Sequence, residues 1–126
     1  MTTRLKALAA ATAVAATVTT VAGTALAQPS APQFLQVTEK EWQITLSRAG
    51  VKKGKVFVEL VNFGTDNHDL VMLSNKKGSK QIAFKAIEPN ARSEKALTLV
   101  AGKYALWCSL PGHKARGMKT TLVVRS

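Results

Sequence analysis

Short runs of apolar residues alternate with turn-forming residues along the chain from Phe34 onward. Within the segment 42–47, Trp42, Ile44 and Leu46 alternate with polar residues, so they fall on one face of an extended strand. No long segment shows the three- and four-residue spacing of an amphipathic helix. The pattern therefore predicts an all-β domain of about seven to eight strands, folded as a sandwich or a barrel.

The other predicted strands are recognised by their β-branched and aromatic residues and by the turn residues between them. We expect these strands at 55–61, 68–73, 95–99, 104–108 and 120–125. The segment 80–87 matches helical spacing only loosely, and we interpret it as a short helix or an irregular crossover. Residues 51–54 are predicted to form a turn, and residues 28–33 a loose N-terminal tail.

The first 27 residues have the composition of a secretory signal peptide. Arg4 and Lys6 precede an uncharged run rich in Ala, Val and Thr, and Ala25-Leu26-Ala27 forms a small-x-small cleavage motif. A retained membrane anchor is the alternative, and the cleavage motif fits it less well. We therefore expect export to the bacterial periplasm or another extracytoplasmic compartment. Residues 28–126 then form one domain, with no stable membrane insertion after cleavage.

The chain is strongly basic, with 18 Lys and Arg against 7 Asp and Glu and a formal net charge of +11. Cleavage after Ala27 would remove two basic residues and no acidic one, and would leave a charge of +9. Such a charge favours nucleic acid, an anionic membrane surface or an acidic protein partner. Export argues against nucleic acid. Because the lysines are spread along the chain, a plain solvated surface is an equally good interpretation.

Cys108 is the only cysteine, so the chain cannot form an internal disulfide. Small exported domains commonly depend on disulfides, and a free thiol in an oxidising compartment is oxidised unless something shields or occupies it. The thiol of Cys108 is therefore free, bound to a metal or paired with another chain.

Potential metal ligands surround this cysteine at regular spacing. His113 follows Cys108 by five residues, Met118 follows His113 by five more, and His68 lies 40 residues before Cys108. A thiolate, two imidazoles and a weak thioether are the ligands of electron-transfer copper sites. Taken singly, each residue has an ordinary alternative role in the core, at the surface or in a hydrogen bond. Together they include every His and Cys of the chain, which favours a metal site.

The segment from Gly102 to Met118 resembles the C-terminal signature of the small cupredoxins, G-x-Y-x-x-x-C-x-x-P-G-H-x-x-x-G-M. This family includes plastocyanin, azurin, pseudoazurin and auracyanin. The segment 62–70 is similar to the family's upstream histidine segment. The resemblance implies a Greek-key β-sandwich and one type 1 copper ion, alternating between Cu(I) and Cu(II). It also implies copper binding through the δ nitrogens of His68 and His113, and His113 as the exposed electron port.

Asp69 departs from the family pattern, because many cupredoxins have Asn after the upstream histidine. We expect Asp69 to accept a hydrogen bond from Ser109 and its backbone N–H to donate to the sulfur of Cys108. Such contacts around a metal tune its reduction potential. The structural disulfide of azurin is absent, which argues against azurin itself.

Residues of the loop between Cys108 and the last strand are expected to form the docking surface for a redox partner. Leu110 and Pro111 supply an apolar patch, and Lys114, Arg116 and Lys119 supply positive charge. Redox encounters use small interfaces whose charge complementarity speeds association. We therefore expect a partner with an acidic docking surface.

The sequence thus favours a monomeric one-electron carrier rather than an enzyme. A non-redox copper carrier with the same ligands is the main alternative. A thiol enzyme would need an orienting group and an oxyanion site, neither of which the sequence indicates. A multicopper oxidase would need more histidines, a binuclear copper centre would need a second cysteine, and zinc in the same ligands would be adventitious.

Overall fold

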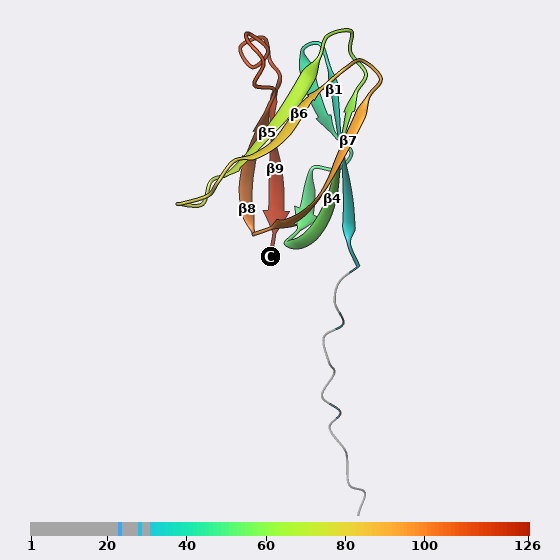
Figure 1. Ribbon diagram of the computed structural model, residues 1–126. Coiled ribbons are helices and arrows are strands. Elements are labelled where there is room, and N and C mark those ends of the chain that lie inside the picture. Colours follow the sequence, from blue (N-terminus) through green and yellow to red (C-terminus); the bar gives the residue numbers. More distant parts are fainter. Residues whose placement is uncertain (1–22, 24–27, 29–30) are drawn as a thin grey trace, which may run out of the picture.

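The computed structural model describes residues 23, 28 and 31–126, and this part of the chain forms nine strands (Figure 1). The strands are β1 (Gln33–Lys40), β2 (Gln43–Leu46), β3 (Gly50–Lys52), β4 (Gly54–Asn62), β5 (His68–Ser74), β6 (Ile82–Ile87), β7 (Arg92–Leu99), β8 (Gly102–Trp107) and β9 (Lys119–Arg125). The prediction of an all-β sandwich is confirmed, with one strand more than expected. The predicted signal peptide, residues 1–27, lies outside the described residues apart from Gly23 and stays a prediction.

The strands form two sheets, with the orders β2-β1-β4-β7 and β3-β9-β8-β5-β6. The pairs β1 with β4 and β3 with β9 are parallel, and the other pairs are antiparallel. The chain repeatedly crosses from one sheet to the other, as in a Greek-key sandwich, instead of pairing each strand with the next. No helix within the described residues is long and apolar enough to cross a membrane.

The core lies between the two sheets and is built by alternation along each strand. In β1, for example, Leu35 and Val37 are fully buried, whereas Phe34 is exposed. Leu122 and Val124 of β9 face inward, as their spacing predicts. Each fully buried aliphatic side chain contributes about 1.5–3 kcal/mol to folding. The two inner faces therefore supply a continuous apolar core to a domain without disulfides.

Two local predictions are wrong, and both concern strands at a sheet edge. Residues 82–87 form β6, which pairs with β5, and not a helix or an irregular crossover. Only Phe84 of β6 is fully buried, so the sequence carries little alternation to reveal a strand there. The predicted turn at 51–54 begins within β3, a three-residue strand held by its parallel pairing with β9.

Strand register brings three separate segments to one end of the sandwich. Glu39 near the end of β1 pairs with Asn62 at the end of β4, and the connection after β4 leads into His68. On the other sheet, Val71 of β5 pairs with Trp107 at the end of β8. The β1–β2 turn, the start of β5 and the β8–β9 loop therefore lie together, at the end opposite the C terminus (Figure 1).

Candidate metal centre

Three of the four predicted ligands present their donor atoms to one another. His68 is the first residue of β5, Cys108 follows β8, and His113 lies in the β8–β9 loop. The Nδ1 atoms of His68 and His113 are 3.1 Å apart, and Cys108 Sγ lies 3.4 Å from His113 Nδ1 and 4.0 Å from His68 Nδ1. The donor atoms of the three side chains all lie within 4.8 Å of one another. Both imidazoles therefore face the sulfur through their δ nitrogens.

Met118 is held beside this triangle by the backbone. Its N–H donates to the carbonyl of His113 at 3.2 Å, and its carbonyl accepts the N–H of Cys108 at 3.1 Å. The Met118 side chain is fully buried. Gly112 and Gly117 have φ values of 79° and 121°, which are left-handed conformations that favour glycine. The loop from Cys108 to Met118 is thus a closed turn that gathers three of the predicted ligands.

The chemistry of the buried thiol fits a metal ligand. Burial raises the pKa of Cys108 to about 11, although the backbone N–H groups of Asp69 and Leu110 oppose this shift. A thiol with such a pKa is protonated at neutral pH and is a poor nucleophile, which disfavours a thiol enzyme. A cation bound by two neutral imidazoles would replace the proton and stabilise the thiolate. A buried thiolate, two imidazoles and a thioether are the donors that suit copper.

Asp69 and Ser109 link the segments that carry His68 and Cys108. Both the backbone N–H and the hydroxyl of Ser109 donate to the Asp69 carboxylate. The backbone N–H of Asp69 also favours the thiolate form of Cys108. The contact of Ser109 with Asp69 agrees with the expectation from the sequence. Asp69 thus joins the two ligand segments.

No protein-family model matches the sequence, and no curated protein matches it. Solved structures do match. An auracyanin from the photosynthetic bacterium Roseiflexus castenholzii has a TM-score of 0.62 at 16% identity, covering 77% of this chain and 100% of its own. Auracyanin A, a blue copper protein from Chloroflexus aurantiacus, has a TM-score of 0.61 at 18% identity, covering 75% and 100%. Reduced rusticyanin has a TM-score of 0.57 at 14% identity, covering 77% and 81%.

The chain has the cupredoxin fold. The structural match extends over 100% of both auracyanin chains. Within the cupredoxin fold, the cluster of His68, Cys108, His113 and Met118 matches the ligand set of a type 1 copper site.

Glu41 contacts Nε2 of His68, the imidazole nitrogen that faces away from the other ligands. The sequence did not indicate this residue. Its Oε1 lies 2.9 Å from His68 Nε2 and 2.8 Å from the backbone nitrogens of both Thr65 and Asp66. These contacts, led by the N–H of Asp66, lower the pKa of Glu41 to about 2. Glu41 precedes His68 by 27 residues, and nothing in the local sequence signals the contact.

Trp42, the next residue, contacts the second imidazole. Its ring lies edge to face with His113, at a centroid distance of 4.9 Å. The guanidinium of Arg116 covers the Trp42 ring at 4.4 Å. Adjacent residues of the β1–β2 turn therefore each contact one of the two histidines. Sequence reasoning had assigned Trp42 only to the inward face of a strand, and it does pack against the core.

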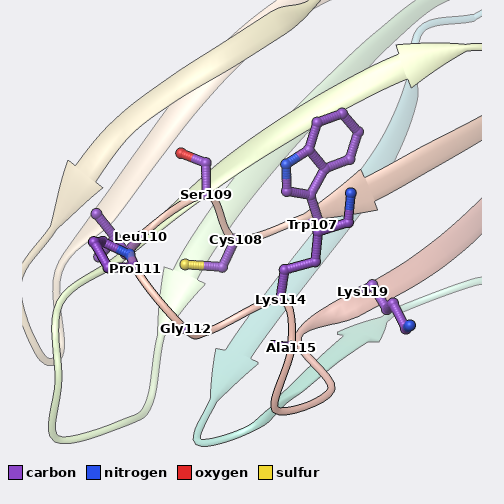
Figure 2. Close-up of a pocket in the computed structure, with 9 residues that line it drawn as sticks. All are labelled: Trp107, Cys108, Ser109, Leu110, Pro111, Gly112, Lys114, Ala115 and Lys119. Carbon is purple, nitrogen blue, oxygen red and sulfur yellow. The ribbon is translucent and has the colours of Figure 1, made fainter.

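The predicted docking residues border an open hollow beside the cluster (Figure 2). Leu110 is half-buried, and Pro111, Lys114 and Lys119 are exposed around it. The ammonium of Lys114 lies 4.3 Å from the centre of the Trp107 ring, and Figure 2 shows the two side chains next to each other. Arg116 is exposed but lies over Trp42 instead of lining the hollow.

Glu39 is a second acidic residue near the centre that the sequence did not reveal. It is fully buried on the inner face of β1, and neither carboxylate oxygen has a hydrogen-bond partner among the described residues. Burial, with a smaller contribution from the negative charge of Asp69, raises the pKa of Glu39 to about 8. The carboxyl group is therefore mostly protonated at neutral pH, which avoids the cost of an unpaired buried charge.

Proposed function

We propose that this protein is an exported one-electron carrier that binds one type 1 copper ion through His68, Cys108, His113 and Met118. The observation that supports this most strongly is the convergence of two δ nitrogens and one sulfur, within 4.8 Å of one another, beside a buried methionine. A bound copper ion would supply the Cu(I)/Cu(II) couple.

The protein's own contribution is rigidity and exclusion of water. His68, Cys108 and Met118 are each fully buried. The backbone hydrogen bonds of the loop and the contacts of Asp69 and Glu41 restrict the movement of the ligands. A site that keeps one geometry in both oxidation states needs little rearrangement when an electron enters or leaves, which favours electron transfer.

The partly exposed His113 offers the route for the electron. It lies in the loop that also carries the apolar Leu110 and Pro111 and the basic Lys114 and Arg116. This combination supports a brief encounter between a monomer and a redox protein with an acidic docking surface. The signal-like residues 1–27 support export, and the raised pKa of Cys108 supports a role without thiol catalysis.

Addition of Cu(II) to the purified protein tests the proposal. We expect an intense visible charge-transfer absorption from the copper–thiolate bond, and Cys108→Ser should abolish it because the thiolate is lost. Cyclic voltammetry of the wild-type protein should show a reversible one-electron couple. A colourless Cu(II) protein without that couple would contradict the proposal.

A chelator experiment separates the electron carrier from the copper-delivery alternative. A delivery protein has to release its ion, whereas buried ligands should retain it in both oxidation states. We expect slow loss of copper from the oxidised and the reduced protein when a strong Cu(I) or Cu(II) chelator is present in excess. Rapid transfer of Cu(I) to the chelator, together with absent colour, would support delivery instead.

A further inference from the structure

Two backbone N–H groups and one imidazole nitrogen converge on one carboxylate oxygen of Glu41. They are the N–H groups of Thr65 and Asp66, each at 2.8 Å, and His68 Nε2, at 2.9 Å. Since His68 Nδ1 faces Cys108 and His113, Nε2 is the nitrogen left to carry the proton and donate to Glu41. Hydrogen bonds to an ionised acceptor are about twice as strong as neutral ones. Glu41 thus holds the His68 ring in the orientation that exposes Nδ1 to the metal site.

Gly64 provides the space that this carboxylate occupies. A Cβ atom built on Gly64 would overlap Glu41 Oε1 and would lie 2.7 Å from Glu41 Cδ and 2.8 Å from Oε2. A side chain at position 64 therefore has to displace the Glu41 carboxylate. Because Gly64 has no side chain, there is space beside His68 for one carboxylate, which the N–H groups of the next two residues bind.

From this arrangement we infer that Glu41 is a positioning residue that fixes the tautomer of His68 and lowers the reduction potential of the bound copper, an inference that rests on the proposed copper function. An anionic acceptor at Nε2 makes the imidazole more basic at Nδ1. A more basic ligand, and a negative charge close to the metal, both stabilise Cu(II) more than Cu(I). The contact between Glu41 and His68 thus favours the oxidised, Cu(II) state of the carrier.

The first test needs no copper. In the copper-free protein labelled with ¹⁵N at histidine, we expect NMR to show His68 as the Nε2–H tautomer, with the proton protected from exchange by Glu41. Gly64→Ala should remove this protection because the carboxylate is displaced. A His68 ring protonated at Nδ1 in the wild-type protein would overturn the inference, whatever the result with copper.

The second test measures the reduction potential of the copper protein. Glu41→Gln keeps an acceptor oxygen but removes the negative charge, so we expect the potential to rise. A tenfold loss of preference for Cu(II) corresponds to about 59 mV, and we expect a shift of this order. Glu59→Gln is the matched control, since Glu59 is also an ionised carboxylate held by side chains, Gln36 and Arg92, without contact to the ligands.

Gly64→Ala provides an independent variant in case Glu41→Gln does not fold. It should raise the potential in the same direction, and the double variant should show less than the sum of the two shifts because both act on one contact. Equal potentials for Glu41→Gln and Glu59→Gln, or fully additive shifts, would overturn the inference. If the wild-type protein shows no charge-transfer band, the copper function fails, while the NMR result still decides the contact of Glu41 with His68.

Discussion

Glu39 and Glu41 are two residues apart, yet their carboxyl groups lie in opposite environments. Glu41 accepts the N–H groups of Thr65 and Asp66 and contacts His68 Nε2, and its pKa falls to about 2. Glu39 points into the core without a hydrogen-bond partner among the described residues, and burial raises its pKa to about 8. Burial penalises the charged form of a carboxyl group, whereas donated hydrogen bonds stabilise it. The end of β1 and the turn that follows it therefore place one neutral and one ionised carboxyl group near the candidate metal centre.

Glu39 makes the stability of the copper-free protein depend on pH. Between pH 4.5 and about 8 the folded protein holds a proton on Glu39 that the unfolded chain has released. The free energy of unfolding therefore falls as pH rises through this range, by on the order of a few kcal/mol, and the Glu39 contribution is fully present only below pH 4.5.

Glu39→Gln removes this ionisation while preserving the shape of the side chain. We expect urea midpoints of the copper-free variant to decline less than those of the wild-type protein between pH 5 and pH 9. The carboxyl group of Glu39 already lacks hydrogen-bond partners within the described part of the chain, so the amide loses no hydrogen bond and the two proteins should differ mainly in the slope of stability against pH. Because both proteins contain the same histidines, the difference between their pH profiles does not include the titration of the histidines. Parallel profiles would show that Glu39 is not the responsible group.

The β8–β9 loop and the β1–β2 turn act as one unit at the scale of structural elements. The loop supplies Cys108, His113 and Met118, and the turn supplies the residues that contact both imidazoles. Their backbones approach closely at Gly117, because a Cβ atom there would lie 3.0 Å from the carbonyl oxygen of Trp42. The position also has a φ of 121°. Glycine at this position allows both the conformation and the contact.

Gly117→Ala should weaken the unit formed by the loop and the turn. We expect a loss of about 1–3 kcal/mol in unfolding free energy from the backbone conformation, measured by urea denaturation. The displaced Trp42 should also alter the visible spectrum of the copper protein. Gly78→Ala is the control, since Gly78 has a φ of 77° but open space around it, in the β5–β6 loop. A spectral change of equal size in both variants would contradict a specific role of the Gly117 contact.

At the scale of the whole molecule, positive charge is widespread, and part of it borders the candidate metal centre. Lys114, Arg116 and Lys119 are exposed in or beside the β8–β9 loop. Lys76, Lys77 and Lys80 lie in the β5–β6 connection. The seven-residue strand β5 begins at His68 and separates this connection from the candidate metal centre. Charges act over about 8–10 Å at moderate ionic strength, so only the first group should act on a reagent at His113.

Oxidation of the reduced copper protein by ferricyanide, a small anionic oxidant, tests this difference. We expect the rate to fall as salt is added, because screening weakens attraction to the positive loop. Lys114→Glu should slow the reaction several-fold at low salt. Lys77→Glu makes the same change in net charge away from the loop and should have little effect. Equal slowing by both variants would indicate that overall charge, and not the loop, governs the encounter.

The sequence by itself determined the features that depend on short-range patterns. Alternation identified most strands, and the spacing of Cys108, His113 and Met118 identified a compact ligand loop, because one closed turn positions all three. The edge strand β6 escaped detection because only one of its residues is fully buried.

Tertiary structure alone decided which side chains lie against the ligands. Glu39 and Trp42 occupy positions that alternation assigns to a face, but alternation does not say which residues of the opposite sheet they meet. Glu41 reaches His68 because the parallel pairing of β1 with β4 brings the β1–β2 turn beside the segment that leads into β5. Such a contact arises from strand register and sheet packing, and therefore has no signature in the residues around it.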